Sequence, residues 1–184
     1  MFGRKGFGFW VLLVCILGVM SASSQAAKRT ALVIGNSDYH KHALRNPVND
    51  ARDIAKALKS LDFEVIVKLN AGQREMEEAV ERFQRNLNRA RVGFFYFAGH
   101  GMQIDGKNFL LPVDIRASSA ADVKYRGTEA DWILAKMEDS LSKVNIVVLD
   151  ACRNNPFRGL RGADEGLAPI QSVRGSFIAY ATSP

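Results

Sequence analysis

The sequence predicts an α/β sandwich with a mostly parallel central sheet. Short apolar runs alternate with amphipathic segments along the chain, which is typical of strands joined by crossover helices. Two of the apolar runs lead into residues that carry chemistry, His100 after FFYFAG and Cys152 after NIVVLDA. Because the carboxyl ends of parallel strands meet at one edge of a sheet, we expect both residues at that edge.

The elements follow in chain order. Strands are expected at 30–35, 63–69, 92–98, 144–150 and 176–182, where short apolar runs occur. Helices are expected at 47–61, 73–90 and from Thr128 to about Leu141, the first two because apolar residues recur there every three or four positions. Asn46 and Pro47 suit the cap and first turn of the first helix, and Asp105 with Gly106 indicates a tight hairpin.

The first 27 residues have a different pattern. Arg4 and Lys5 precede the apolar run FWVLLVCILGVM, and small residues follow up to Ala26. This is typical of a secretory signal peptide. The alternative is an uncleaved membrane anchor, for which the run from Phe7 to Met20 is short, since a spanning helix needs about 20 apolar residues. We expect residues 1–27 to direct export to the periplasm or the medium.

Composition bears on partners and on redox chemistry. Loss of residues 1–26 removes Arg4 and Lys5 and no acid, so the net charge falls from +6 to +4. The remaining basic residues are interspersed with acids, so no nucleic-acid interface is expected. Cys15 lies in the apolar run, which leaves Cys152 as the single thiol of the mature chain. Such a thiol is either buried or reactive.

Cys152 and His100 together would provide a nucleophile and its base. A free thiol has a pKa of roughly 8.5 and is mostly protonated at neutral pH. A neighbouring imidazole increases the thiolate fraction and can later protonate the leaving amine.

Four ordered motifs carry a resemblance. ALVIGNSDY, LRNPVNDA, YFAGHG and VVLDACRNNP together resemble a bacterial caspase-family cysteine peptidase of the caspase, metacaspase and paracaspase clan. The resemblance implies a caspase-type α/β/α sandwich and a peptidase domain over 28–184. It also implies Cys152 as nucleophile, His100 as general base, and the backbone amides of Gly101 and Cys152 as oxyanion donors. Gly101 has an alternative explanation, since a glycine after a strand can simply serve a turn.

The resemblance also implies a missing part. In that family a further strand and helices follow the segment SFIAYATSP, whereas this sequence stops at Pro184. We therefore expect a C-terminally incomplete domain, completed by a longer gene product or by another chain such as a dimer partner. Strand 176–182 would otherwise be an exposed edge.

Substrate preference is expected to be basic. Caspases proper have Gln two residues before the catalytic Cys, whereas this chain has Asp150, as metacaspase-like members do. Asp50, in VNDA, matches the second acid with which those members bind Arg or Lys. Two neighbouring carboxylates repel each other unless a cation lies between them. The alternative is that Asp50 starts a helix and Asp150 ends a strand.

The segment between the last two expected strands, RNNPFRGLRGADEGLAPIQSVRG, is rich in Gly and Arg and lacks periodicity. We expect an exposed loop. Arg158, Arg161 and Arg174 are candidate autoprocessing sites under a basic specificity. The alternative is a linker whose arginines only keep it soluble.

No metal or other cofactor is expected. Some metacaspases depend on calcium through a cluster of acids, but here only Asp105 and Asp114 flank the hairpin. His40 and His42 lie in a polar loop without a Cys or acidic partner, so we expect a solvated loop there.

Protein or peptide substrates are the expected partners, and two other functions stay open. Cys152 and Arg158 have the spacing of phosphatase loops, but Pro156 removes a backbone amide and no helical pattern follows. The second is a non-enzymatic caspase-like interaction module. Such homologues generally lack the Cys or the His, and this chain has both.

Overall fold

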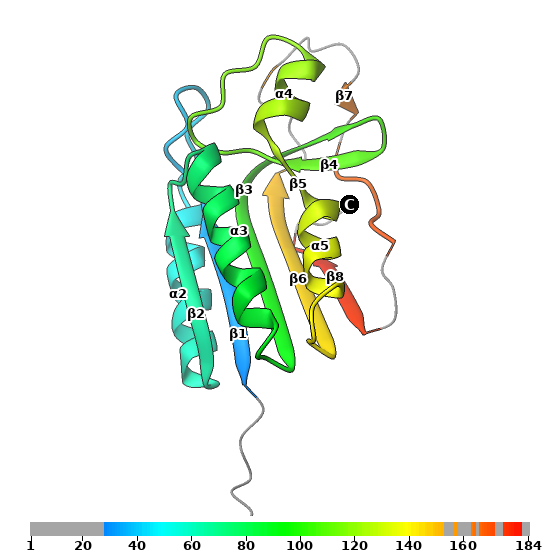
Figure 1. The fold of residues 1–184 in the computed structure, drawn as a ribbon. Helices are drawn as coiled ribbons and strands as arrows, with labels where there is room; N and C mark the ends of the chain where they lie inside the picture. Colours follow the sequence, from blue (N-terminus) through cyan, green and yellow to red (C-terminus); the bar gives the residue numbers. More distant parts are fainter. Residues whose placement is uncertain (1–27, 153–156, 158–162, 165, 172–174, 182–184) are drawn as a thin grey trace, which may run out of the picture.

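The structure is a computed structural model that describes residues 28–152, 157, 163–164, 166–171 and 175–181. A central sheet carries helices on both faces (Figure 1), which is the α/β/α arrangement expected from the sequence. The five main strands are β1 (Arg29–Gly35), β2 (Phe63–Leu69), β3 (Val92–Ile104), β6 (Val144–Cys152) and β8 (Ser176–Tyr180). They pair in the order β2-β1-β3-β6-β8, and each of these pairs is parallel.

The helices divide between the two faces. Helix α2 (Pro47–Ser60) covers one face, where Ala51, Ala55 and Leu58 pack on the buried side chains of β1 and β3. Helices α3 (Gln73–Leu87) and α5 (Ala130–Glu138) cover the other. Burying these apolar surfaces is the main favourable contribution to folding.

The N-terminus of α2 lies very close to the sheet. A Cβ atom added to Gly35, the last residue of β1, would lie 2.4 Å from the carbonyl oxygen of Pro47 and 2.6 Å from Cβ of Ala51. Only glycine permits this approach. It brings the first turn of α2, which contains Asp50, to the carboxyl edge of the sheet.

Strand β3 continues beyond the parallel sheet. It turns at Asp105 and Gly106, both with positive φ, and pairs antiparallel with β4 (Lys107–Leu110), as the hairpin prediction requires. Strand β4 pairs in turn with β5 (Thr128–Glu129), and β3 also pairs with β7 (Ala163–Asp164). A second, small antiparallel layer therefore stands above the carboxyl edge of the main sheet.

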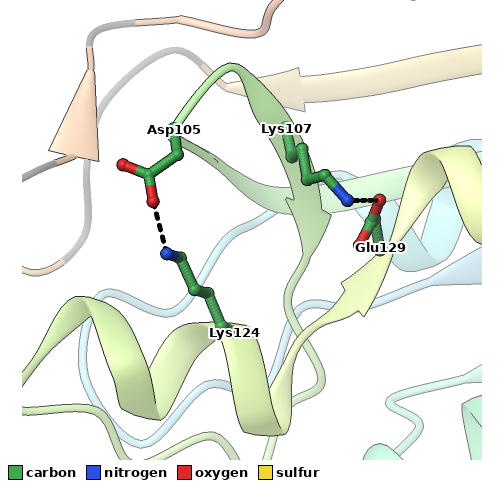
Figure 2. A network of polar contacts seen from close by, with 4 residues as sticks. All are labelled: Asp105, Lys107, Lys124 and Glu129. Atoms are coloured by element: carbon green, nitrogen blue, oxygen red, sulfur yellow. Dashed lines mark hydrogen bonds and ion pairs between the residues drawn. The ribbon is translucent and has the colours of Figure 1, made fainter.

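Two exposed ion pairs lie within and beside this layer (Figure 2). Lys107 lies 2.8 Å from Glu129 of β5, and Asp105 pairs with Lys124 of helix α4 (Ala120–Arg126). Both pairs are exposed to solvent, which screens the attraction, so each contributes little to stability.

Three expectations about local structure need correction. The helix expected from Thr128 begins only at Ala130, because Thr128 is buried and pairs with Leu110 in β5. Helix α4 was not expected, since its seven residues are too few to display a helical period; its Ser119–Asp122 capping box was the available signal. The segment before β8 is not wholly an exposed loop, because Ala168 is only 7% exposed.

Asn108 explains how that segment is held. Its buried side chain donates a hydrogen bond to the carbonyl oxygen of Ala168 at 2.8 Å and accepts one from the amide of Ala168 at 2.7 Å. These two bonds satisfy the backbone amide and carbonyl of Ala168, and the Tyr180 hydroxyl adds a hydrogen bond to the same carbonyl at 2.9 Å.

The ends of the described chain bear on two other predictions. Strand β8 pairs only with β6 among the described strands, and Phe177 on it is 64% exposed. The signal peptide or anchor expected at 1–27 lies outside the described residues. Within the described ranges, no helix is long and apolar enough to cross a membrane.

Candidate active site

The two residues of the candidate dyad lie on neighbouring strands. β3 and β6 are parallel, and His100 and Cys152 are Cα partners in their register. Neighbouring strands lie about 4.8 Å apart. Cys152 is the last residue of β6, whereas β3 runs on past His100 to Ile104. The sheet therefore brings together two residues that are far apart in the sequence.

His100 is held in one orientation. The residue is 5% exposed, and its ring centroid lies 4.5 Å from that of Tyr39 at a tilt of 55°. Nε2 lies 2.7 Å from the carbonyl oxygen of His42. A carbonyl oxygen can only accept, so Nε2 must carry the hydrogen. Nδ1 then keeps its lone pair, and within the described part of the chain this buried atom has no hydrogen-bond partner.

Burial also decides the charge of this imidazole. Desolvation lowers the pKa of His100 below its ordinary value of 6.5, and the hydrogen bond to the His42 carbonyl opposes this only in part. The ring is therefore neutral at pH 7. A neutral imidazole with a free Nδ1 lone pair can accept a proton.

Tyr39 and His42 were not predicted as site residues. The Tyr39 hydroxyl accepts a hydrogen bond from the amide of His100 and donates one to the carbonyl oxygen of Leu111, both at 3.0 Å. His42 acts through its backbone and has a φ of 60°. Tyr39 lies inside the first of the four motifs and could have been singled out there. A backbone carbonyl has no residue signature, so nothing in the sequence indicated His42.

Two variants separate these contributions. His42→Gly should retain wild-type kcat/KM on a good peptide substrate, because glycine keeps the carbonyl and adopts a positive φ readily. Tyr39→Phe should lower the free energy of unfolding by about 1 to 3 kcal/mol, because it leaves the buried amide of His100 without its acceptor. Urea denaturation measures the second effect. If His42→Gly were as inactive as a dyad variant, the side chain of His42 would be the group that matters.

Close packing favours glycine at position 101. A Cβ there would lie 3.0 Å from Cβ of Ala151 and 3.1 Å from Cδ2 of Leu167. Gly101 is within β3, paired with Leu110, so the turn offered as its alternative explanation is wrong.

Asp50 and Asp150 approach each other on the α2 side of the sheet. Asp150 is the Cα partner of Ala98 in the β3–β6 register, and its Oδ2 accepts a hydrogen bond from the Tyr96 hydroxyl at 3.3 Å. Burial, then the charge of Asp150 and then that of Asp53 raise the pKa of Asp50 above its ordinary value. Burial and both carboxylates likewise raise the pKa of Tyr96. The alternative explanation is met for Asp50, which lies in the first turn of α2, but it is wrong for Asp150, because β6 runs on to Cys152.

These two carboxylates form a partly buried acidic pair. Both are half-buried, and among the described residues no ion pair joins either of them to a basic side chain. Like charges in such a site disfavour double ionisation. A cation placed between them would remove the repulsion.

The other residues singled out in the sequence are three arginines of the segment before β8 and two acids near the hairpin. Arg158, Arg161 and Arg174 lie outside the described residues. Asp105 faces Lys124, and Asp114 accepts a hydrogen bond from the amide of Gln73. The described part of the chain contains no group of three or more His, Cys, Asp or Glu that could hold a metal. Independence of calcium stays a prediction.

Known proteins are similar to this chain in sequence. The caspase domain pattern matches residues 28–184. Human mucosa-associated lymphoid tissue lymphoma translocation protein 1 is 34% identical over 132 residues, which cover 70% of this chain and 15% of that protein. Caspase a of Danio rerio is 28% identical over 158 residues, which cover 82% of this chain and 40% of that protein.

A solved structure shows the same fold. The crystal structure of the Drosophila initiator caspase Dronc has a TM-score of 0.59 and 13% identity, covering 84% of this chain and 55% of that chain. The chain thus spans less than half the length of the two curated relatives. The bacterial source expected from the motifs stays a prediction. The match over residues 28–184 establishes that the chain belongs to the caspase family, whose members are cysteine peptidases.

Proposed function

We propose that this chain is a cysteine endopeptidase that cleaves peptide bonds after Arg or Lys, with Cys152 as nucleophile and His100 as general base. One observation carries the assignment: Nδ1 of His100 is buried and without a partner in the described structure, on the strand position that pairs with Cys152. A buried polar atom without a partner is costly. A reaction that uses this lone pair gives a reason for that cost.

In the proposed acylation step, one proton passes from the thiol to His100 and then to the leaving amine. Nδ1 of His100 takes the thiol proton of Cys152, and the sulfur forms a bond to the carbonyl carbon of the substrate. The backbone amides of Gly101 and Cys152 donate hydrogen bonds to the tetrahedral oxygen. When the C–N bond breaks, His100 returns the proton to the leaving amine. Water then hydrolyses the thioester with His100 again as base.

The His42 carbonyl supports both charge states of the ring. It accepts from Nε2–H in the neutral imidazole, and it remains an acceptor when Nδ1 is protonated. The bond becomes charge-assisted at that moment, and such hydrogen bonds are roughly twice as strong as neutral ones. The contact at 2.7 Å therefore stabilises the imidazolium that forms during attack.

The acidic pair supports the choice of a basic residue before the scissile bond. The raised pKa of Asp50, caused by burial and by Asp150, means that the empty site is electrostatically unfavourable. A guanidinium or ammonium group relieves this, whereas an acidic substrate side chain adds a third like charge. Basic specificity is thus favoured by attraction and by exclusion together.

A panel of three fluorogenic peptides tests the proposal. They differ only in having Arg, Lys or Asp before the scissile bond, and each is assayed in reducing buffer with and without calcium. Cleavage after Arg and Lys that is absent in Cys152→Ala is the expected result. Cleavage after Asp would contradict the acidic pair, and no cleavage of any peptide would favour the non-enzymatic module.

The pH profile should report the lowered pKa of His100. Attack needs the neutral ring, so kcat/KM should stay high down to the ordinary value of 6.5 and decline only as the pH falls through the lowered pKa. Stability should begin to fall at a higher pH than activity, from 6.5 down to the lowered pKa and no further, because the unfolded chain binds the proton before the folded protein does. Parallel measurements of kcat/KM and Tm check this. An acid limb centred above the ordinary value would contradict it.

Two further proposals depend on the same chemistry. Autoprocessing after Arg158, Arg161 or Arg174 follows from a basic specificity, and intact mass spectrometry of wild type beside Cys152→Ala tests it. Equal masses would exclude it. Export through residues 1–27 is tested by sequencing the N-terminus of the mature protein, which should begin near Lys28.

A further inference from the structure

A cavity of about 500 Å³ opens beside His100. Its wall is mainly apolar and includes Tyr39, Leu111, Ile115, Ala117 and Phe157, with His100 itself forming one side. This volume lies within the range of roughly 300 to 1,000 Å³ that is usual for ligand sites. Besides His100 on β3 and Phe157 after β6, the wall comes from the loop after β1 and from the segment after β4, the second strand of the hairpin in Figure 2.

The cavity and the acidic pair lie on different sides of His100. Asp50, Asp150 and Tyr96 contribute nothing to the cavity wall. Along β3 the acidic pair is level with Ala98, the partner of Asp150. The cavity lies further on, where the amide of Leu111 donates a hydrogen bond to the carbonyl oxygen of His100 at 2.9 Å.

The proposed mechanism determines which part of the substrate lies on each side of His100. In the proposed mechanism the acyl part of the substrate stays on Cys152, with its basic side chain at the acidic pair. The leaving amine must reach the imidazole that protonates it. The residues that follow the scissile bond therefore leave past His100, on the side where the cavity opens.

We propose that this cavity binds a large apolar side chain from the first two residues after the scissile bond, an inference that rests on the proposed function. The apolar wall favours an aromatic or branched aliphatic side chain over glycine. The lining includes Lys41 and Arg116, both exposed, and none of the described lining residues is acidic. An acidic residue further along the leaving segment would be attracted there.

Matched substrates test this inference. Internally quenched peptides keep Arg before the scissile bond and carry Phe, Leu or Gly at the first or second position after it. We expect kcat/KM for Phe or Leu at one of these positions to exceed that for Gly by at least about tenfold. Equal kcat/KM across the series would overturn the inference.

An ester without a leaving-side residue separates the two proposals. Hydrolysis of an Arg methyl ester depends on Cys152, His100 and the acidic pair alone. If wild type hydrolyses the ester and cleaves all peptides equally, only the cavity assignment fails. If it acts on neither ester nor peptide, the proposed function fails.

Substitution of Ala117 supplies the structural control. Ala117→Phe should fill the cavity and bring the ratio of kcat/KM for Phe over Gly peptides close to one, whereas Ala117→Ser should keep the wild-type ratio. A ratio that persists in folded Ala117→Phe would overturn the assignment. Thermal melts establish folding, and if Ala117→Phe does not fold, the wild-type peptide series still decides.

Discussion

Cys152→Ala is expected to abolish cleavage of an Arg peptide, and His100→Ala to lower kcat/KM by about a thousandfold or more. The reason is that the two residues act as one unit: without the thiol no acyl-enzyme forms, and without the imidazole the thiol keeps its proton. A double variant should therefore be no less active than Cys152→Ala alone. Steady-state assays of the three variants measure these effects.

Labelling of the thiol gives an independent measure of the dyad. Cys152 is the single cysteine once residues 1–26 are removed, so iodoacetamide alkylates one defined site. The rate at pH 7 follows the thiolate fraction, and it should fall in His100→Ala. Equal alkylation rates in wild type and His100→Ala would contradict a base at this position, even if the variant were inactive for another reason.

Asp50→Asn and Asp150→Asn are each expected to lower kcat/KM for the Arg peptide by roughly 10- to 100-fold, the effect of losing one charged hydrogen-bond acceptor. Asp139→Asn is the matched control, because it removes the same charge from an exposed position at the end of α5, on the other face of the sheet. An equal loss in Asp139→Asn would point to general electrostatic attraction and contradict a specific acidic pair.

Stability should move in the opposite direction for Asp50→Asn. The raised pKa of Asp50 means that its charge is unfavourable in the folded protein at neutral pH. Removing that charge should raise Tm while it lowers activity on Arg peptides. A fall in Tm would show that the carboxylate of Asp50 serves the structure.

Most of the fold could be predicted because its strands carry strong local patterns. Strand β2 matches its expected range of 63–69, and α3 begins at Gln73 as expected, since apolar periodicity and a buried core agree there. Prediction was weaker above the sheet. Thr128 has a capping residue type but lies in β5, because pairing with Leu110 outweighed the local preference.

The site was predicted unevenly for a physical reason. His100, Cys152, Asp50 and Asp150 are identified by side-chain type within motifs, and the register places His100 level with Cys152, with Asp150 beside them on β6. The orientation of the imidazole comes from the His42 carbonyl, and the cavity comes from segments that meet only after folding. Neither a backbone atom nor an empty volume leaves a pattern in the sequence.

Nε2 of His100 is bound by the peptide carbonyl of His42 and not by a carboxylate. In a triad with a carboxylate, the third member can itself be protonated, and it adds a formal negative charge to the site. A peptide oxygen does neither, so the Cys152–His100 pair itself should take up a single proton, at the imidazole, as the pH falls. It also frees position 42 from any demand on its side chain. Chains that share this mechanism can therefore differ there, provided that the residue tolerates a left-handed turn.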